Sequence, residues 1–69
     1  MRFDIYGHYE LDVIRDGAKW KVFERGEGKR VPLNSVIIPA DLREDEIATY
    51  LDDLFHALAR PGQTVRRID

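Results

Sequence analysis

Cysteine is absent from this 69-residue chain, and histidine is scarce. Without cysteine, disulfides and the commonest structural zinc sites are excluded. The two histidines, His8 and His56, are too few for a convincing metal cage unless carboxylates supplement them. We therefore predict no bound metal and no cofactor. A chain this short has a core of marginal stability, so a partner subunit is one way of completing it.

Long hydrophobic runs are also missing. No apolar run approaches the ~18 residues of a membrane span, so we expect no membrane association. Residues 1–4 contain no apolar signal core and give no indication of export. Together with the lack of cysteine, this favours a cytoplasmic protein. The hydrophobic content of 43% and the aromatic content of 10% are too high for a disordered chain, so we predict one small domain spanning residues 1–69.

The chain has little excess charge of either sign. Its net charge of −2 argues weakly against general binding to nucleic acid. The charge is unevenly distributed, because residues 1–40 carry +1 and residues 41–69 carry −3. Six carboxylates lie within residues 41–53, beside the single base Arg43. Acidic residues favour the positive end of a helix dipole, so this cluster indicates a helix start before it indicates a function.

Hydrophobic and polar residues alternate through the first half of the chain, as in antiparallel strands with one buried face. We predict that the strands lie within residues 2–38. Gly7 interrupts the first run, and it is either a bulge in one long strand or the turn between two short strands. Tyr6, His8 and Glu10 fall on the predicted outer face of the sheet.

Asp16-Gly17 predicts a two-residue hairpin turn. A turn at this place pairs Val13 with Trp20 and Asp12 with Lys21. The apolar pair then faces the core and the charged pair faces solvent, which is the test that a correct register must pass. We expect Trp20 to be the largest contributor to the core, because a buried aromatic side chain removes ~150–250 Å² from water.

Gly26-Glu27-Gly28-Lys29 predicts the next turn. A further strand is expected over residues 29–38, divided near Pro32 because proline cannot donate to a central ladder. The glycines and the lysine also invite comparison with a phosphate-binding loop. That motif needs a glycine five residues before its Gly-Lys pair and a Ser or Thr after the lysine. Phe23 and Arg30 occupy those positions, so a hairpin turn is the better interpretation.

An amphipathic helix is predicted over residues 43–60, with Asp41 as its cap and Pro61-Gly62 as its stop. A short tail, residues 61–69, follows, and Val65 and Ile68 are its candidate anchors to the body. The fold class is therefore α+β, a two-layer sandwich in which an antiparallel sheet of three to four strands precedes one C-terminal helix. The predicted helix stripe is Ile47, Tyr50, Leu51, Leu54, Phe55 and Leu58. Its expected sheet partners are Phe3, Ile5, Leu11, Val13, Trp20, Val22, Ile38, and Val36 or Ile37.

Asp52, Asp53 and His56 form a polar cluster on the predicted helix, because residues three and four apart are neighbours there. A carboxylate beside a histidine can orient a general base or bind a metal. No candidate nucleophile lies near them in the sequence. We favour a solvated helix face with local ion pairs, and we predict no catalytic residues.

A possible binding surface is predicted on the outer face of the sheet. It contains basic and aromatic residues of the kind that stack single-stranded bases. Cross-strand pairing with Glu10 and Asp12 explains the lysines without a ligand, so we rank it first, self-association second and nucleic-acid binding third. The apolar outer residues, such as Tyr6 and Ile14, favour contact with a protein partner or with a second copy of the chain. The residues of this surface are Lys19, Lys21, Phe23, Lys29 and Arg30.

Four segments carry a family resemblance: Arg2-Phe3-Asp4-Ile5-Tyr6-Gly7, Trp20-Lys21-Val22-Phe23, Ile38-Pro39-Ala40-Asp41-Leu42, and Tyr50-Leu51-Asp52-Asp53-Leu54-Phe55-His56-Ala57-Leu58-Ala59. With these segments, the chain resembles a family of short, uncharacterised bacterial proteins of unknown function. The resemblance covers nearly the whole chain and implies a bacterial, stand-alone domain. It implies no activity and no functional residues.

The sequence favours a small non-enzymatic domain that binds a protein partner or itself, because no catalytic set is assembled and apolar residues occupy the outer sheet face. The alternative is a regulatory domain that contacts nucleic acid through the basic outer face. Strands followed by one helix are loosely similar to small antitoxin-like domains, which is an analogy of topology alone.

Overall fold

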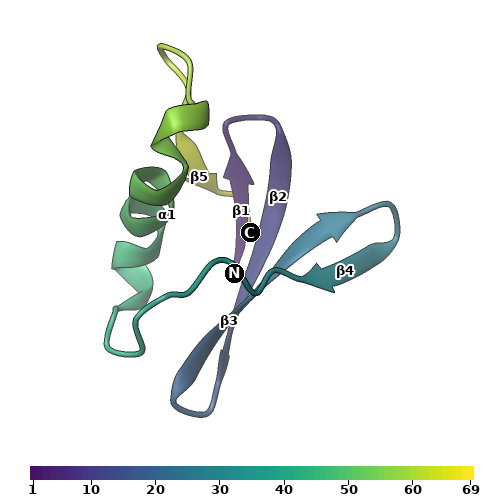
Figure 1. Ribbon diagram of the computed structural model, residues 1–69, viewed down its shortest axis with the longest axis vertical. Helices are drawn as coiled ribbons and strands as arrows, with labels where there is room; N and C mark the ends of the chain where they lie inside the picture. The colour runs from purple at the N-terminus through teal and green to yellow at the C-terminus, as the bar shows by residue number, and fades with distance from the viewer.

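The computed structural model describes residues 1–69, except for the side chain of Leu58. The described backbone forms one antiparallel sheet in the order β4-β3-β2-β1-β5, and a single helix covers one of its faces (Figure 1). This confirms the predicted α+β class, with five strands instead of three to four. The strands are β1 (Arg2–Ile5), β2 (Tyr9–Asp16), β3 (Lys19–Gly26), β4 (Lys29–Pro32) and β5 (Val65–Arg67). The helical elements are η1 (Glu44–Glu46), α1 (Ile47–Phe55) and η2 (His56–Leu58).

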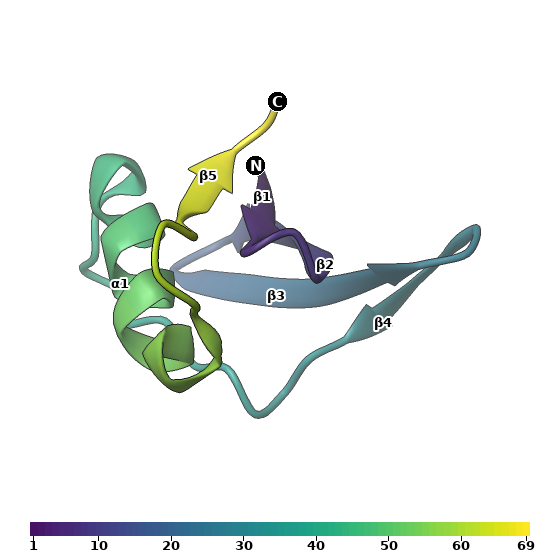
Figure 2. The same cartoon turned by 90° about the horizontal axis from the view of Figure 1, so that it is seen from above.

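The β3–β4 hairpin projects away from the helix in both views (Figures 1 and 2). The helix lies instead at the opposite end of the strand order, where it contacts β1 and β5. After β4, an irregular segment leads from the end of that strand back to the helix (Figure 2). One end of the sheet is therefore two layers thick, and the other end is a single layer.

Gly7 belongs to a turn between two strands. Ile5 pairs with Tyr9, which leaves three residues in the loop. Tyr6 and Gly7 both adopt positive φ angles, of 55° and 74°. The positive φ of Tyr6 breaks the alternation of the strand, so its ring lies in the core at 3% exposure. The placement of Tyr6 on the outer face was therefore wrong.

The β2–β3 turn consists of Gly17 and Ala18, with Asp16 opposite Lys19. The predicted register, which centred the turn on Asp16-Gly17, is thus wrong by two residues. Gly17 has a φ of 61° and takes the first central position, where a type II′ hairpin turn requires glycine. A shift of two residues preserves the faces, because side chains alternate with a period of two. The predicted buried face was therefore correct although the pairing was wrong.

The corrected register separates Asp12 from Lys21. Asp12 lies opposite Phe23, and Lys21 lies opposite Ile14. Lys21 instead forms an ion pair with Asp16, with 2.7 Å between Nζ and Oδ2. The predicted Asp12–Lys21 pair does not exist in this register.

The strand predicted over residues 29–38 ends at Pro32. Beyond it, Leu33 still donates to the Val22 carbonyl over 2.8 Å, and a turn then brings the Val36 N–H to the Leu33 carbonyl at 3.2 Å. Residues 36–38 are therefore irregular, which corrects the prediction that the strand continues to residue 38. Ile38 is nevertheless buried in the core as predicted.

The helical segment runs from residue 44 to residue 58, close to the predicted range of 43–60. Its N-terminus is closed by Glu46, whose Oε1 accepts the Arg43 N–H over 3.0 Å, so Asp41 is not the cap. Ile47 and Leu51 are fully buried, whereas Leu54 is 48% exposed and was wrongly assigned to the core. The helix packs on β1 and β5, and Phe55 also contacts Tyr9 of β2, but the part of its apolar stripe that carries Leu54 is left uncovered. The prediction for the Leu58 side chain lies outside the described residues.

The tail contains β5, which pairs antiparallel with β1 and places Val65 opposite Ile5. Val65 packs against the core, while Ile68 stays 42% exposed. The helix is therefore followed by a strand, which the sequence pattern did not predict.

Trp20 is only half-buried and is not the main core residue that we predicted. It lies near the start of β3, where its indole N–H donates to the Leu42 carbonyl over 3.0 Å. The Arg15 guanidinium stacks over its ring at 4.7 Å. The buried hydrophobic core consists of Phe3, Ile5, Tyr6, Leu11, Val13, Val22, Ile38, Ile47 and Leu51.

Candidate interaction groove

A groove of about 460 Å³ lies between the first half of β3 and the segment that follows β4. It forms because β4 is shorter than β3. The last paired residues are Phe23 and Pro32, and the chain leaves the sheet after Leu33. The groove is lined by Lys19, Trp20, Lys21, Val22, Phe23, Pro32, Leu33, Asn34, Val36 and Ile37.

The backbone of β3 is open beside this groove. Antiparallel residues alternate between bonding one neighbour and bonding the other. Val22 accepts from Leu33 on the β4 side, so Trp20, two residues earlier, also directs its N–H and C=O toward that side. β4 ends before it reaches Trp20. The groove therefore borders a short open edge of the sheet.

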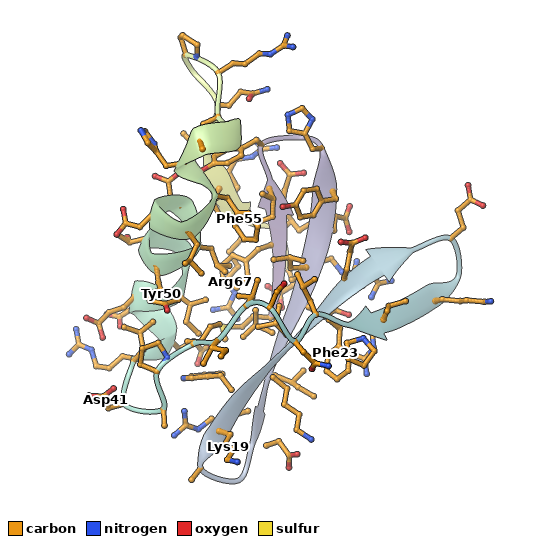
Figure 3. The ribbon with its side chains drawn as sticks, in the orientation of Figure 1. Lys19, Phe23, Asp41, Tyr50, Phe55 and Arg67 are labelled. Atoms are coloured by element: carbon orange, nitrogen blue, oxygen red, sulfur yellow. The ribbon has the colours of Figure 1, made fainter. Side chains whose placement is uncertain are left out.

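The far wall of the groove is held by the helix. The Tyr50 hydroxyl donates to the Ile37 carbonyl over 2.7 Å, which ties the irregular segment to α1 (Figure 3). The Ile37 side chain is left 75% exposed. The backbone of this isoleucine is already fixed, so a partner can bury its side chain without the entropy cost of ordering the segment.

The charged residues that line the groove are both lysines. Lys21 is paired with Asp16 on the neighbouring strand. Lys19 lies at the β2–β3 turn (Figure 3) and forms no ion pair among the described side chains. The groove therefore combines apolar walls with positive charge at one rim.

The structure brings together part of the predicted basic surface. Lys19, Lys21 and Phe23 all line the groove. Arg30 stacks its guanidinium over the Phe23 ring at 4.8 Å, and it lies on the neighbouring strand. Lys29 lies opposite Gly26 at the tip of the β3–β4 hairpin, away from the groove.

Asp12 is the centre of an arginine cluster that sequence reasoning missed. Its side chain lies on the outer sheet face, and the residue is 7% exposed. Arg25, Arg30 and Arg2 approach its carboxylate at 3.0, 3.4 and 3.7 Å. Burial alone would raise the pKa of Asp12, but the hydrogen bond and charge of Arg25, with Arg30 and Arg2, hold it below its usual value. These arginines come from three strands, so no spacing along the sequence indicates the cluster.

The predicted helix cluster of Asp52, Asp53 and His56 separates in the structure. Asp52 is half-buried, and its carboxylate accepts a hydrogen bond from the Tyr6 hydroxyl. The same hydroxyl lies 3.1 Å from the Asp52 carbonyl. Asp53 and His56 are exposed. Among the described residues, no group of three or more His, Cys, Asp or Glu side chains is placed to hold a metal ion.

The Tyr6–Asp52 contact joins the β1–β2 turn to the helix. Burial and then the hydrogen bond to Asp52 raise the pKa of Tyr6 from 10.0 to about 12. A hydroxyl with a raised pKa stabilises the fold fully below pH 10.0, and that contribution is lost as the pH rises toward about 12. The contact therefore acts as a structural clasp at neutral pH.

We expect Tyr6→Phe to lower the free energy of unfolding by about 1–2 kcal/mol, because it removes the donor and leaves the half-buried Asp52 carboxylate without it. Urea unfolding at pH 7 measures this loss. In alkaline solution, wild type and variant should converge between pH 10 and about 12. A difference that stays constant across this range would contradict the assigned role of the hydroxyl.

The fold and the groove define a small α+β domain with one helix on one end of an antiparallel sheet. The chain belongs to a family described as a domain of unknown function (DUF7661), whose model matches residues 1–69. This confirms the resemblance to a family of short proteins of unknown function. No curated protein and no solved structure gives a significant match. No helix of the described residues is long and apolar enough to cross a membrane.

Proposed function

We propose that this protein is a small non-enzymatic interaction domain that binds a protein partner in the groove beside β3. The carrying observation is an apolar groove of about 460 Å³ next to an open sheet edge, with Ile37 exposed at its rim. Exposed apolar side chains grouped around a hollow are typical of protein-binding surfaces. Val31, on the adjoining β4, is a second exposed apolar side chain at this end of the sheet.

Two features support binding in preference to catalysis. In the polar cluster of the helix, Asp52 is engaged in a structural contact with Tyr6, and Asp53 and His56 are exposed. The groove itself is lined by apolar, lysine and asparagine side chains, with no histidine, carboxylate or hydroxyl side chain among its lining residues. A domain of this size therefore acts best by presenting a surface.

A second candidate function is contact with nucleic acid, as in a regulatory, antitoxin-like domain. Arg2, Arg25 and Arg30 gather around one carboxylate, which leaves a local excess of positive charge on the outer face. Asp12 occupies the centre of this cluster, however, and Arg30 covers the Phe23 ring that a base would need for stacking. We rank this function second for that reason.

The proposed function is tested with a phage-displayed library of random peptides, selected against the immobilised full-length chain. Enriched peptides should bind Ile37→Asp about tenfold more weakly than wild type, because a charge replaces an apolar contact of ~1.5–3 kcal/mol. Ile68→Asp is the matched control, because Ile68 is also exposed but lies outside the groove. Its binding should stay within about twofold of wild type.

Two results would count against the proposed function. The first is a set of peptides that bind Ile37→Asp and wild type equally well. The second is tighter binding of short single-stranded DNA or RNA than of any peptide, with an affinity that falls steeply with salt and is weakened by Arg30→Ala. The second result would move the nucleic-acid candidate to first place.

A further inference from the structure

We infer that the groove accepts an extended segment of a partner protein as an added strand, and that this segment alternates apolar and acidic side chains. The inference rests on the proposed function and specifies its partner. The open backbone of β3, the walls of the groove and the charges at its rim each point to this ligand.

The open backbone fixes the position of the added strand. Trp20 directs its N–H and C=O into the groove, in line with the hydrogen bonds that β4 makes further along β3. A segment placed there continues the line of β4 and satisfies both groups with its own main chain. Main-chain pairing at an exposed sheet edge is a general mode of peptide recognition. Pro32 and the turn after Leu33 keep the chain's own β4 from occupying this place.

The two faces of the sheet then select the side chains of the segment. On the inner face, alternate residues of the segment meet the apolar side chains of Trp20, Val36 and Ile37. On the outer face, the intervening residues meet Lys19, which forms no ion pair among the described side chains, and Lys21, whose ammonium is shared with Asp16. Because successive side chains of a strand point to opposite faces, the segment must alternate apolar and acidic residues to satisfy both.

Charge disfavours the chain's own outer strands as the occupant. A second copy offers the outer edges of β4, which carries Lys29 and Arg30, and of β5, which carries Arg66 and Arg67. Because the two basic residues are adjacent in each strand, pairing either edge with β3 puts one of them on the face of Lys19 and Lys21, and like charges directly opposite one another destabilise a strand pair. An acidic segment of a different protein has the complementary charge.

Three short synthetic peptides provide the probe: one that alternates valine and aspartate, one that alternates valine and lysine, and one with the first composition arranged in two blocks. Each is titrated into the ¹⁵N-labelled full-length protein and followed by amide NMR. The alternating acidic peptide should bind at least about tenfold more tightly than the other two, with an affinity that decreases as salt is added. Exchange of the Trp20 amide hydrogen should slow at least about tenfold, because that amide enters a hydrogen bond.

Charge reversal in the protein provides the matched test. Lys19→Glu should weaken binding of the alternating acidic peptide about tenfold, because it places like charges at the rim of the groove. Lys29→Glu, at the tip of the hairpin and outside the groove, should change it by no more than about twofold. Equal effects of the two variants would overturn the assignment of the acidic residues to the groove rim.

The outcomes separate this inference from the proposed function. If library peptides bind in an Ile37-dependent manner but prove basic, or leave Trp20 amide exchange unchanged, the inference fails and the proposed function stands. If no peptide binds in an Ile37-dependent manner, both fail. Binding of the acidic peptide in either arrangement with equal affinity would show that charge acts without an added strand, which also overturns the inference.

Discussion

Replacing Leu51 with alanine is expected to lower the free energy of unfolding by about 3 kcal/mol, the largest effect of any substitution considered for this protein. Leu51 is fully buried, and it lies on the helix face that packs onto the sheet. Truncation removes its transfer free energy and leaves a cavity that the surrounding side chains fill only partly. A domain of this size has a small free energy of unfolding. A large fraction of the Leu51→Ala molecules should therefore be unfolded at moderate temperature.

Leu54→Ala is the matched control, one turn further along the same helix. Its side chain is 48% exposed, so the same truncation should cost no more than about 1 kcal/mol. Urea unfolding followed by circular dichroism measures both losses. Both variants replace leucine with alanine in the same helix, so the difference between the two losses reports the difference in burial. Equal losses would mean that the helix lies on the sheet in a different rotation from the one described.

Asp12→Asn is expected to lower the free energy of unfolding by about 1–3 kcal/mol. The amide removes the negative charge on which Arg2, Arg25 and Arg30 converge, and it leaves their positive charges to repel one another. The arginine side chains are partly exposed, so solvent screening keeps the loss below that of a fully buried ion pair. Asp16→Asn is the control, because its pair with Lys21 is exposed and its removal should cost less.

The Asp12 contribution also has a defined dependence on pH. The folded state holds the pKa of Asp12 below its ordinary value of 3.8. The stabilisation is therefore fully present above pH 3.8 and is lost as the pH falls through the lower, folded-state pKa. Urea midpoints of wild type and Asp12→Asn, measured at neutral pH and in acid, should differ at neutral pH and converge in acid. A gap that widens in acid would contradict the assigned pairing.

The faces of the sheet could be predicted from the sequence, whereas the strand pairing could not. Alternation identifies which side chains share a face, and Leu11, Val13 and Val22 are buried as expected. The pairing depends on whether the turn is centred before or after Gly17, and both choices keep the alternation. The burial of Tyr6 could not be predicted for a different reason. It depends on a positive φ at a residue other than glycine, which has no reliable sequence signal.

The candidate site was predicted only in part. Lys19, Lys21 and Phe23 were grouped correctly because they alternate on one strand, and all three line the groove. The groove itself exists because β4 stops at Pro32 while β3 continues, and because Tyr50 holds the segment that follows. Both facts depend on tertiary contacts between residues far apart in the sequence. The same is true of the arginines around Asp12, which come from three different strands.

The most direct test of the proposed interaction site is an amide NMR shift map of the full-length protein, recorded with the tightest peptide from the library selection. Binding in the groove predicts that the largest changes fall on residues 19–23 and 33–37. These two segments line the groove from opposite sides. Changes confined to the exposed face of α1, or spread over the arginines around Asp12, would contradict the assignment of the partner site to the groove.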